Sequence, residues 1–353
     1  MTITPTTLAE AAEAVKSLAS SSRQVLPVGR DSSRQEIPPG RKAEMISSRG
    51  LNKVVSLEPD NLLAVVEAGL TAAEVDEALA PTGLYWPVTG PFDHTLGAIM
   101  NEGLLGVETM ARGTMCDWIL GATMVDAGGN LISSGGRTLK NVSGYDLTRL
   151  AWRSRGALAM SVVFILKLIP RPKVFEALEW RVDSPNAAAS LAERVILGKI
   201  RPEALRLVAE PGRLRLVAWL CGFPEMVSHQ EASLTALLGR PDNRRTDGFE
   251  YFRDHFSRWP CRHPDLSLRQ GSRRAILDFL RKLHVPSEPP DSWRFDLDIG
   301  GGRAHLGTAL LQSASDLIAV EPLSDPSNLV RRIKAAVDPG NVFLPLSPEP
   351  VSA

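Results

Sequence analysis

The residues best able to do chemistry lie in three segments rich in glycine, threonine and asparagine, all before residue 160. The first is Pro27-Val28-Gly29 with the loop after it, the second runs from Pro87 to Asp117, and the third from Gly135 to Leu158. Glycine has no Cβ, so its backbone N–H groups can approach a ligand closely. Successive backbone amides can form a concavity that binds an anion such as a pyrophosphate. On composition alone, tight turns between strands are the better explanation.

Common catalytic and nucleotide-binding motifs are missing from the sequence. It contains no GxxxxGK[ST] of a P-loop NTPase, no HExxH, no GxSxG and no calcium loop. Gly300-Gly301-Gly302 is followed by Arg303-Ala304-His305, without the third glycine of a dinucleotide-binding fingerprint. The six histidines lie far apart, and a lone histidine such as His94 is more often structural than catalytic. The residues therefore predict no metal site and leave the catalytic residue unknown.

Length and composition describe an ordinary folded chain. Its 353 residues suit about two or three packed subdomains. Lys plus Arg is 40 and Asp plus Glu is 40, which argues against nucleic acid as a partner because phosphate binding needs a basic surface. The three cysteines, Cys116, Cys221 and Cys261, suggest no disulfide framework and indicate a reducing, cytoplasmic compartment. They are also too few for an iron–sulfur cluster, which usually takes about four thiolates.

Neither a transmembrane segment nor a signal peptide is expected. The longest apolar run, Ala157 to Leu166, is interrupted by Lys167 and is shorter than the roughly 20 residues of a membrane helix. It is predicted to be a buried strand. The N-terminal residues MTITPTTLAEAAEAVK lack a basic leader followed by an apolar stretch.

Hydrophobic periodicity predicts alternating helices and strands up to residue 169. Thr7 to Glu10 and Thr71 to Glu74 have the pattern of capping boxes that begin helices, and Asp146 can cap a short helix through Leu150. Residues 87–114 are expected to be loop. Strands are expected at 25–28, 43–46, 53–57, 62–67, 118–125, 131–133 and 157–169.

Pro170-Arg171-Pro172 marks a boundary, since prolines end both helices and strands. The second part reads as a smaller α+β unit, with residues 240–264 charged and irregular. Strands are expected at 176–182, 205–207 and 213–220, and helices at 187–197, 228–238, 272–283 and 329–337.

The order of these segments resembles the FAD-binding domain of flavoproteins of the vanillyl-alcohol-oxidase type, the PCMH fold. The matching runs, in the family's order, are LNKVVSLEPDNLLAVVEAGLTAAEVDEAL, TLGAIMNEG, ARGTMCDWILGATMVDAGGNLISSGG, KNVSGYDLTRL, RGALAMSVVFILKLIPRP and the closing VDPGNVFLP. KNVSGYDLTRL is especially similar to the FAD-binding subunit of glycolate oxidase. The resemblance covers about residues 5–172 and, more weakly, the tail.

This resemblance implies an α+β fold in three parts. Residues 1–172 would form the PCMH-type FAD-binding domain, built of two α+β subdomains. Residues 173–322 would form a shortened α+β cap domain, and residues 323–353 a C-terminal return segment.

The resemblance also implies which residues bind FAD. The pyrophosphate would lie against the first loop, the flavin and phosphates against the second segment, and the third segment and the tail would complete the site. Lys140, Asp117 and Tyr145 have packing or capping as their alternative roles. The implied contacts are Val28, Gly29, Arg30, Asp31, Ser32 and Ser33; Pro87, Thr89, Gly90, Thr95 and Gly97; Arg112, Gly113 and Asp117; Lys140, Asn141, Gly144 and Tyr145; Gly156 and Val162; and Asn341.

The sequence departs from the family at several glycine positions. Arg30-Asp31-Ser32-Ser33-Arg34 stands where the family has consecutive glycines, and Asp31 adds an anion near an anionic ligand unless Arg30 or Arg34 offsets it. Ala98 replaces a common glycine, and Arg153 to Ala159 replaces a Gly-Ser-x-Gly-Thr-Leu-Gly-like run. These departures favour weakened, altered or lost FAD binding.

The implied function is the FAD-binding subunit of a glycolate (2-hydroxy-acid) oxidase or dehydrogenase. The substrate's electrons would pass through FAD to a sister flavoprotein subunit and an iron–sulfur subunit. The sequence has no histidine-rich cap segment of the related catalytic subunits, and His305 is a poor candidate base. Two alternatives stay open: a non-catalytic assembly subunit that keeps the fold, and a free-standing flavin oxidoreductase acting on another substrate.

Overall fold

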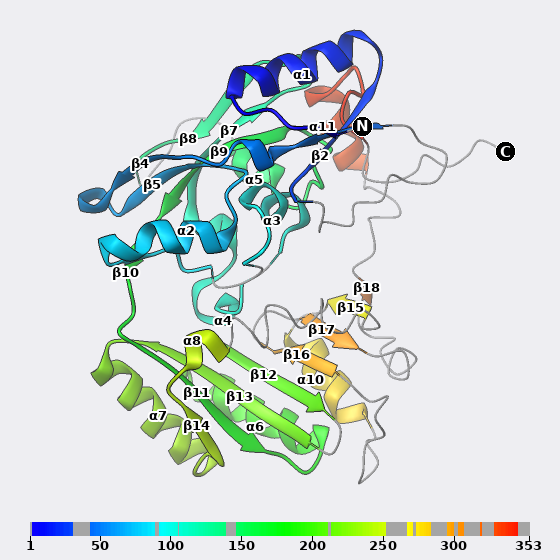
Figure 1. The fold of residues 1–353 in the computed structure, drawn as a ribbon. Coiled ribbons are helices and arrows are strands. Elements are labelled where there is room, and N and C mark those ends of the chain that lie inside the picture. Colours follow the sequence, from blue (N-terminus) through cyan, green and yellow to red (C-terminus); the bar gives the residue numbers. More distant parts are fainter. Residues whose placement is uncertain are drawn as a thin grey trace, which may run out of the picture. The chain divides into compact units, whose positions relative to one another are not determined.

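The chain forms two compact units, each described here by itself (Figure 1). Unit 1 contains residues 1–105, 114–170 and 321–353, and unit 2 contains residues 106–113 and 171–320. A computed structural model describes residues 2–30, 43–88, 92–104, 106–138, 146–210, 213–251, 267–270, 273–283, 295–299, 303–306, 318–319 and 328–344.

The first layer of unit 1 is a parallel sheet with the strand order β1-β3-β2. The strands are β1 (Thr2–Ile3), β2 (Gln24–Val28) and β3 (Ala43–Ser47). Helix α1 (Leu8–Ser20) begins where the Thr7 hydroxyl accepts a hydrogen bond from the Glu10 N–H, as predicted. The return bond of the expected capping box differs, because the Glu10 carboxylate accepts from the Thr6 N–H at 2.8 Å. The apolar face of α1 packs onto the buried side chains of β2 and β3.

The second layer of unit 1 is an antiparallel sheet with the order β4-β5-β9-β7-β8. Its strands are β4 (Val54–Glu58), β5 (Leu63–Glu67), β7 (Ile119–Val125), β8 (Leu131–Gly135) and β9 (Met160–Lys167). β9 lies in the centre and is mostly buried, which confirms the strand predicted from its apolar run. The Asp126 carboxylate holds the β7–β8 turn by accepting from the Gly128 and Asn130 N–H groups. A short pair, β6 (Leu84–Tyr85) with β10 (Ile169–Pro170), completes the unit's strands as described.

The helices of unit 1 confirm two predicted caps and correct one expectation. Thr71 and Glu74 form both bonds of a capping box, and Asp146 accepts from the Arg149 N–H. The prediction of loop throughout residues 87–114 is wrong, because α3 and α4 lie there. The bounds are α2 (Ala72–Leu79), α3 (Leu96–Glu102), α4 (Thr109–Arg112, within unit 2), α5 (Leu147–Ala151) and α11 (Asn328–Val337).

Helix α3 forms in spite of its glycine because of a cap and burial. The Thr95 hydroxyl accepts from the Ala98 N–H at 3.2 Å, and all residues of α3 except Glu102 are buried. Tertiary packing of this kind overrides a weak local helix propensity.

Unit 2 is an antiparallel sheet whose long helices α6, α7 and α10 lie on one face. Its order is β14-β11-β13-β12-β16-β17-β15-β18. The elements are β11 (Val174–Arg181), α6 (Pro185–Leu197), β12 (Ala204–Glu210), β13 (Arg213–Gly222), α7 (Pro224–Leu238), β14 (Asn243–Arg245), α8 (Gly248–Tyr251), β15 (Ser267–Gln270), α10 (Arg273–Lys282), β16 (Phe295–Asp298), β17 (Arg303–Leu306) and β18 (Ile318–Ala319).

The two faces of this sheet are covered differently. Helices α6, α7 and α10 lie on one face (Figure 1), and their apolar side chains form the larger core. On the other face, Trp219 is fully buried beside Phe175 and Phe249. β14 and α8 lie within the stretch that was expected to be irregular. None of the helices in the described part of the chain combines the length and apolar character needed to cross a membrane.

Candidate functional site

The end of β2 packs directly against the first turn of α3. A Cβ on Gly29 would overlap Thr95 Oγ1 and would lie 2.9 Å from Ala98 Cβ, so only glycine fits there. The Ser47 hydroxyl donates to the Gly29 carbonyl at 2.8 Å and fixes the direction of the chain as it leaves the strand. The backbone after β2 is therefore held close to the helix.

Gly97 continues this close approach on α3. Its N–H donates to the Ala68 carbonyl at 2.9 Å, and a Cβ there would lie 3.3 Å from Ser48 Oγ. Ser48 begins the short 3-10 helix that follows β3, and its hydroxyl contacts the Val28 carbonyl. Gly29 of the first predicted segment therefore lies close to Thr95 and Gly97 of the second.

The turn at residues 153–156 joins the same place. Gly156 has a left-handed φ of 72°, and a Cβ there would lie 3.0 Å from Pro27 Cδ and 3.3 Å from Asn101 Nδ2. The Arg153 and Arg155 N–H groups donate to the Met100 and Asn101 carbonyls at the end of α3. These bonds satisfy carbonyls that a helix end leaves without partners. We call Gly29, Thr95, Gly97 and Gly156 the glycine cradle.

Two buried polar side chains beside the cradle were not predicted. Asn101 and Ser154 are each 5% exposed, and Asn101 Oδ1 and Ser154 Oγ have no hydrogen-bond partner among the described residues. Buried polar atoms normally have partners, since an unmet one costs about 1–3 kcal/mol. The sequence signal that could have found Asn101 is an asparagine directly after the apolar run LGAIM.

The C-terminal segment is hydrogen-bonded to the residue that follows Gly156 of the cradle. Lys334 Nζ donates to the carbonyls of Ala157 and Phe343, each at 2.7 Å, and pairs with Asp338. Asp338, 2% exposed, accepts from the Val342 and Phe343 N–H groups. Burial lowers the pKa of Lys334, against the effect of Asp338.

The returning chain also pairs with β2. The Val25 N–H donates to the Val342 carbonyl at 2.6 Å, and the Leu344 N–H donates to the Val25 carbonyl at 2.8 Å. Phe343 is fully buried beside this pairing. The tail therefore holds β2 on one side and the turn at 157 on the other.

Several predicted residues lie away from the cradle or have other contacts. Asn341 lies beside Gln24 at the start of β2, roughly 16 Å along the strand from Gly29. A cavity of about 580 Å³ opens beside Asn341. The Asp117 carboxylate caps the Thr114 N–H and pairs with Arg149, which matches its alternative capping role. Contact of Asn341 or Asp117 with FAD stays a prediction.

Four further predicted contacts, Val28, Arg30, Pro87 and Val162, lie among the described residues. Val28 is half-buried, Arg30 is exposed and Pro87 is buried. Val162 is buried in the core, where its carbonyl accepts from the Ala68 N–H. Asp31, Ser32, Ser33, Thr89, Gly90, Lys140, Asn141, Gly144 and Tyr145 lie outside the described residues.

His94 lies just before helix α3 and is half-buried. Burial lowers its pKa, against the raising effect of Asp93, so the ring is neutral at pH 7. Its Nδ1 has no hydrogen-bond partner in the described part of the chain. Among the described residues, no three histidine, cysteine, aspartate or glutamate side chains come together as a metal ion would require.

Arg112 and Gly113 belong to unit 2. The Arg112 guanidinium makes two hydrogen bonds of 2.8 Å to the Glu203 carboxylate and approaches Cys221 Sγ at 3.6 Å. Glu203 is 6% exposed, and Glu108 beside it is 1% exposed. Burial, reinforced by Glu108, raises the pKa of Glu203 to about 7, against the lowering effect of Arg112. This pair anchors residues 106–113 within unit 2.

We expect Arg112→Met to destabilise unit 2 more at pH 8 than at pH 5. The pKa of Glu203 in the folded state, about 7, exceeds its ordinary value of 4.5. Its proton therefore favours the folded state below pH 4.5, and this contribution disappears as the pH rises through 7. Without Arg112, which lowers the pKa of Glu203, the folded state at pH 8 must either bury the carboxylate alone or keep it protonated, and breaking a buried pair costs about 3–5 kcal/mol, whereas at pH 5 the carboxyl is neutral in either case.

Urea unfolding of the full chain at both pH values measures this difference. Arg281→Met is the matched control, because Arg281 pairs with Glu193 on the surface of the same unit. An Arg112→Met deficit that does not grow between pH 5 and pH 8 would contradict the assignment of a buried, proton-binding Glu203.

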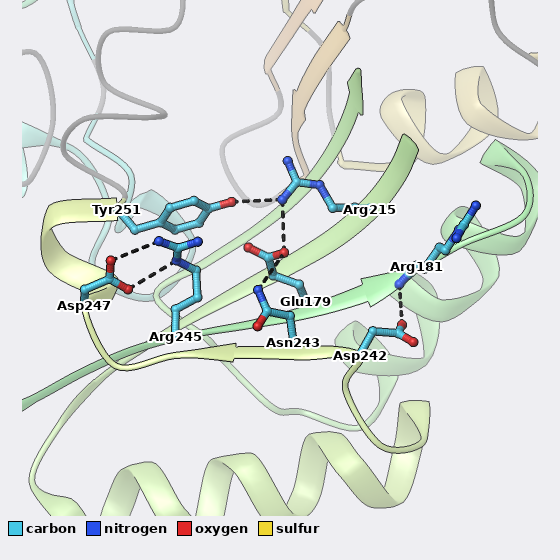
Figure 2. Close-up of polar contacts among 8 residues, drawn as sticks. All are labelled: Glu179, Arg181, Arg215, Asp242, Asn243, Arg245, Asp247 and Tyr251. Carbon is cyan, nitrogen blue, oxygen red and sulfur yellow. Dashed lines mark hydrogen bonds and ion pairs between the residues drawn. The ribbon is translucent and has the colours of Figure 1, made fainter. Parts of the chain in front are cut away.

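A second polar cluster lies on the sheet of unit 2, and sequence reasoning missed it. Figure 2 shows Glu179 of β11 facing Arg215 of the neighbouring β13. Arg215 Nη1 donates to Glu179 Oε2 at 3.0 Å and to the Tyr251 hydroxyl at 3.3 Å. Asn243 Nδ2 also donates to Glu179 Oε2. The alternating arginines at 213 and 215 were the sequence signal for a polar stripe on this strand.

The same cluster fastens the edge strand β14 and helix α8. Arg245 pairs with Asp247 through two bonds and lies 4.4 Å from the centre of the Tyr251 ring (Figure 2). Asp242 accepts from the Arg181 N–H at 2.6 Å. Burial raises the pKa of Tyr251, so its hydroxyl keeps its proton. These contacts account for the cluster as a structural network of unit 2.

Comparison with known proteins bears on the cofactor. Residues 1–135 match the sequence model of a family described as "FAD binding domain". The chain is 31% identical over 163 residues to glycolate oxidase subunit GlcD of Bacillus subtilis, covering 46% of this chain and 35% of that protein. It is 29% identical over 143 residues to glycolate oxidase subunit GlcE of Escherichia coli, covering 40% of this chain and 41% of that protein.

A further relative is also named as an enzyme of a 2-hydroxy acid. D-lactate dehydrogenase of Archaeoglobus fulgidus is 31% identical over 147 residues, covering 40% of this chain and 33% of that protein. The matches thus span well under half of these relatives' lengths. A solved structure of alkyldihydroxyacetonephosphate synthase has the same fold, with a TM-score of 0.73 at 13% identity over 97% of this chain and 76% of that one.

The cradle fits the cofactor of that family. Gly29 and Gly156 let the end of β2, helix α3 and the turn at 153–156 approach one another closely, and the buried polar atoms Asn101 Oδ1 and Ser154 Oγ have no partner among the described residues. Such positions suit a ligand with phosphate and hydroxyl groups. Residues 1–135 are therefore similar to an FAD binding domain, the chain has the PCMH-type FAD-binding fold, and the cofactor that this match indicates is FAD.

Proposed function

We propose that the chain is the FAD-binding subunit of an oxidase or dehydrogenase of 2-hydroxy acids. The observation that carries the proposal is the match of residues 1–135 to an FAD binding domain, together with the similarity to relatives named glycolate oxidase subunits and D-lactate dehydrogenase. Glycolate and D-lactate are both small acids with a hydroxyl on the carbon next to the carboxylate. The substrate class is therefore the chemistry that these names have in common.

FAD supplies the redox chemistry when bound, by accepting two electrons from the carbon that bears the hydroxyl. The chain's own residues bind and orient it. Gly29 and Gly156 let the backbone come close, Thr95 caps the helix between them, and Lys334 keeps the tail against the cradle. The roles of Lys140, Asn141, Gly144 and Tyr145 in the same site remain part of the proposal.

Electrons would leave the chain through partner subunits. The sequence has three cysteines, fewer than the roughly four that an iron–sulfur cluster usually takes. Two of the relatives are themselves named as subunits. A sister flavoprotein subunit and an iron–sulfur subunit are the partners that this pattern supports.

A visible absorption spectrum of the purified chain, with any co-purifying subunits, tests the proposal. We expect about one FAD per chain, released and identified, because the cradle fits the cofactor. Glycolate or D-lactate added without oxygen should bleach the flavin band, whereas acetate, which lacks the hydroxyl, should not.

Two outcomes would contradict the proposal in different ways. A folded chain that takes up no flavin from excess FAD would favour the assembly-subunit alternative. The side chains from Arg30 to Arg34, in place of glycines, are the sequence feature that supports this alternative. Bound FAD that no 2-hydroxy acid reduces would keep the cofactor and overturn the substrate class.

A further inference from the structure

The turn that contributes Gly156 to the cradle has an unusual backbone. Arg153 and Arg155 have left-handed φ values of 61° and 53°, next to the 72° of Gly156. A non-glycine residue in this region costs about 1–2 kcal/mol. The α3 carbonyls that accept from Arg153 and Arg155 hold the turn in place. Strain retained in this way often accompanies a binding site.

Arg155 is a cation without a counter-charge among the residues that the structure describes. The residue is half-buried, and among the described residues its guanidinium has no hydrogen bond, ion pair or ring contact. Its only polar contact within the described part of the chain is the backbone bond from its N–H to the Asn101 carbonyl. Partial burial of a charge is unfavourable unless a counter-charge is present. An anionic ligand is the counter-charge that would account for Arg155.

The surroundings of Arg155 identify which anion. Its neighbour Gly156 contacts Pro27, two residues before Gly29, so the turn lies beside the end of β2. Ser154 belongs to the same turn and Asn101 to the helix that holds it, and their side-chain oxygens have no partner within the described part of the chain. A ligand that meets all three groups carries phosphate together with hydroxyl or amino groups.

The first loop needs such a cation. Gly29 is followed by Arg30-Asp31-Ser32-Ser33, so side chains replace glycine amides and Asp31 adds a negative charge. Backbone amides alone then offer less to a pyrophosphate than a run of glycines would. An arginine supplied from elsewhere offsets this, because its planar fork matches phosphate oxygens.

We propose that Arg155 binds the pyrophosphate of FAD, with Ser154 and Asn101 hydrogen-bonding the adjoining polar groups of the cofactor. The charge comes from the strained turn at the end of α3, where it makes up for the side chains in the loop after β2. This inference concerns cofactor binding and does not depend on which substrate is oxidised.

The test compares Arg155→Gly with Arg153→Gly in the full chain. Both variants remove an arginine from a left-handed position, and glycine relieves the backbone strain in both. Arg153 is exposed and packs over Gly103, so it is the matched control. We expect Arg155→Gly to raise the Kd for FAD by about 10- to 100-fold, as for loss of a charge-assisted hydrogen bond. Arg153→Gly should stay within about threefold.

Salt and two further ligands show whether the charge is responsible. The FAD affinity of the native chain should fall with ionic strength, and it should fall less steeply in Arg155→Gly. ADP, which has the diphosphate without the flavin, should lose affinity with FAD, whereas riboflavin, which has no phosphate, should not. Equal losses for riboflavin would indicate a structural defect and overturn the role of Arg155.

The remaining outcomes are also distinct. Equal Kd values for the two glycine variants, with unchanged thermal unfolding of the flavin-free chains, would overturn the role of Arg155 alone. A native chain that binds no FAD would overturn both this inference and the cofactor on which it rests.

Discussion

Replacing Gly29 with alanine is expected to remove most FAD binding from a chain that still folds. The new Cβ would overlap Thr95 Oγ1 and lie 2.9 Å from Ala98 Cβ, so the first turn of α3 must move away from β2. Overpacking of this kind costs about 1–3 kcal/mol, which is below the stability of a typical domain. Because Thr95 and Gly97 move with the helix, the Kd for FAD should rise at least about tenfold, and less flavin should co-purify.

Gly83→Ala is the control that separates stability from binding. Gly83 has a left-handed φ of 68°, and a Cβ there meets no atom within 4 Å. The variant should lose about 1–2 kcal/mol of stability through backbone strain, without a change in flavin content. If Gly29→Ala retained FAD as well as Gly83→Ala, the contact between β2 and α3 would not be part of the cofactor site.

Lys334→Met should lower the free energy of unfolding by about 3–5 kcal/mol. The substitution leaves the fully buried Asp338 carboxylate without its cation and removes the donor to the Ala157 and Phe343 carbonyls. The side chain is replaced by one of similar length, so the loss reports the polar contacts rather than a cavity. Urea unfolding monitored by tryptophan fluorescence measures it.

Arg332→Met on the same helix is the comparison. Arg332 is exposed, so its replacement should change the free energy of unfolding by no more than about 0.5 kcal/mol. Similar values for the two variants would mean that the tail is not held through Lys334. Excess FAD should recover part of the loss if the tail supports the cradle, because a ligand that binds the folded state stabilises it.

Local signals predicted most of the elements correctly. The caps at Thr7, Thr71 and Asp146 are each set by a side chain and a backbone N–H three residues apart, and all three are present. Short-range chemistry of this kind is readable from the sequence. Helix α3 was missed because its seven residues contain a glycine and depend on burial against distant strands.

Some residues of the candidate site could be predicted from the sequence, and others could be found only in the structure. Gly29, Thr95, Gly97 and Gly156 were found through an ordered resemblance and do lie together. Asn101, Ser154 and Arg155 were not found, since their significance lies in side chains that have no polar partner among the described residues, which no sequence pattern expresses. Arg112 was expected at the cofactor, but its partner Glu203 lies 91 residues away, and only the structure shows that pairing.

The pairing of β2 with the C-terminal segment has a consequence for synthesis on the ribosome. Gln24 contacts Asn341, 317 residues further along the chain, and Val25 bonds Val342 and Leu344 on the side of β2 away from β3. At about 5–20 residues per second, that side of the strand waits roughly 15–60 s for its partner. Residues 171–320, which fall between the two, belong to the other compact unit and are complete earlier. Unit 1 is thus the first to begin and the last to finish, and an unpaired strand edge is open to association with other chains throughout that interval.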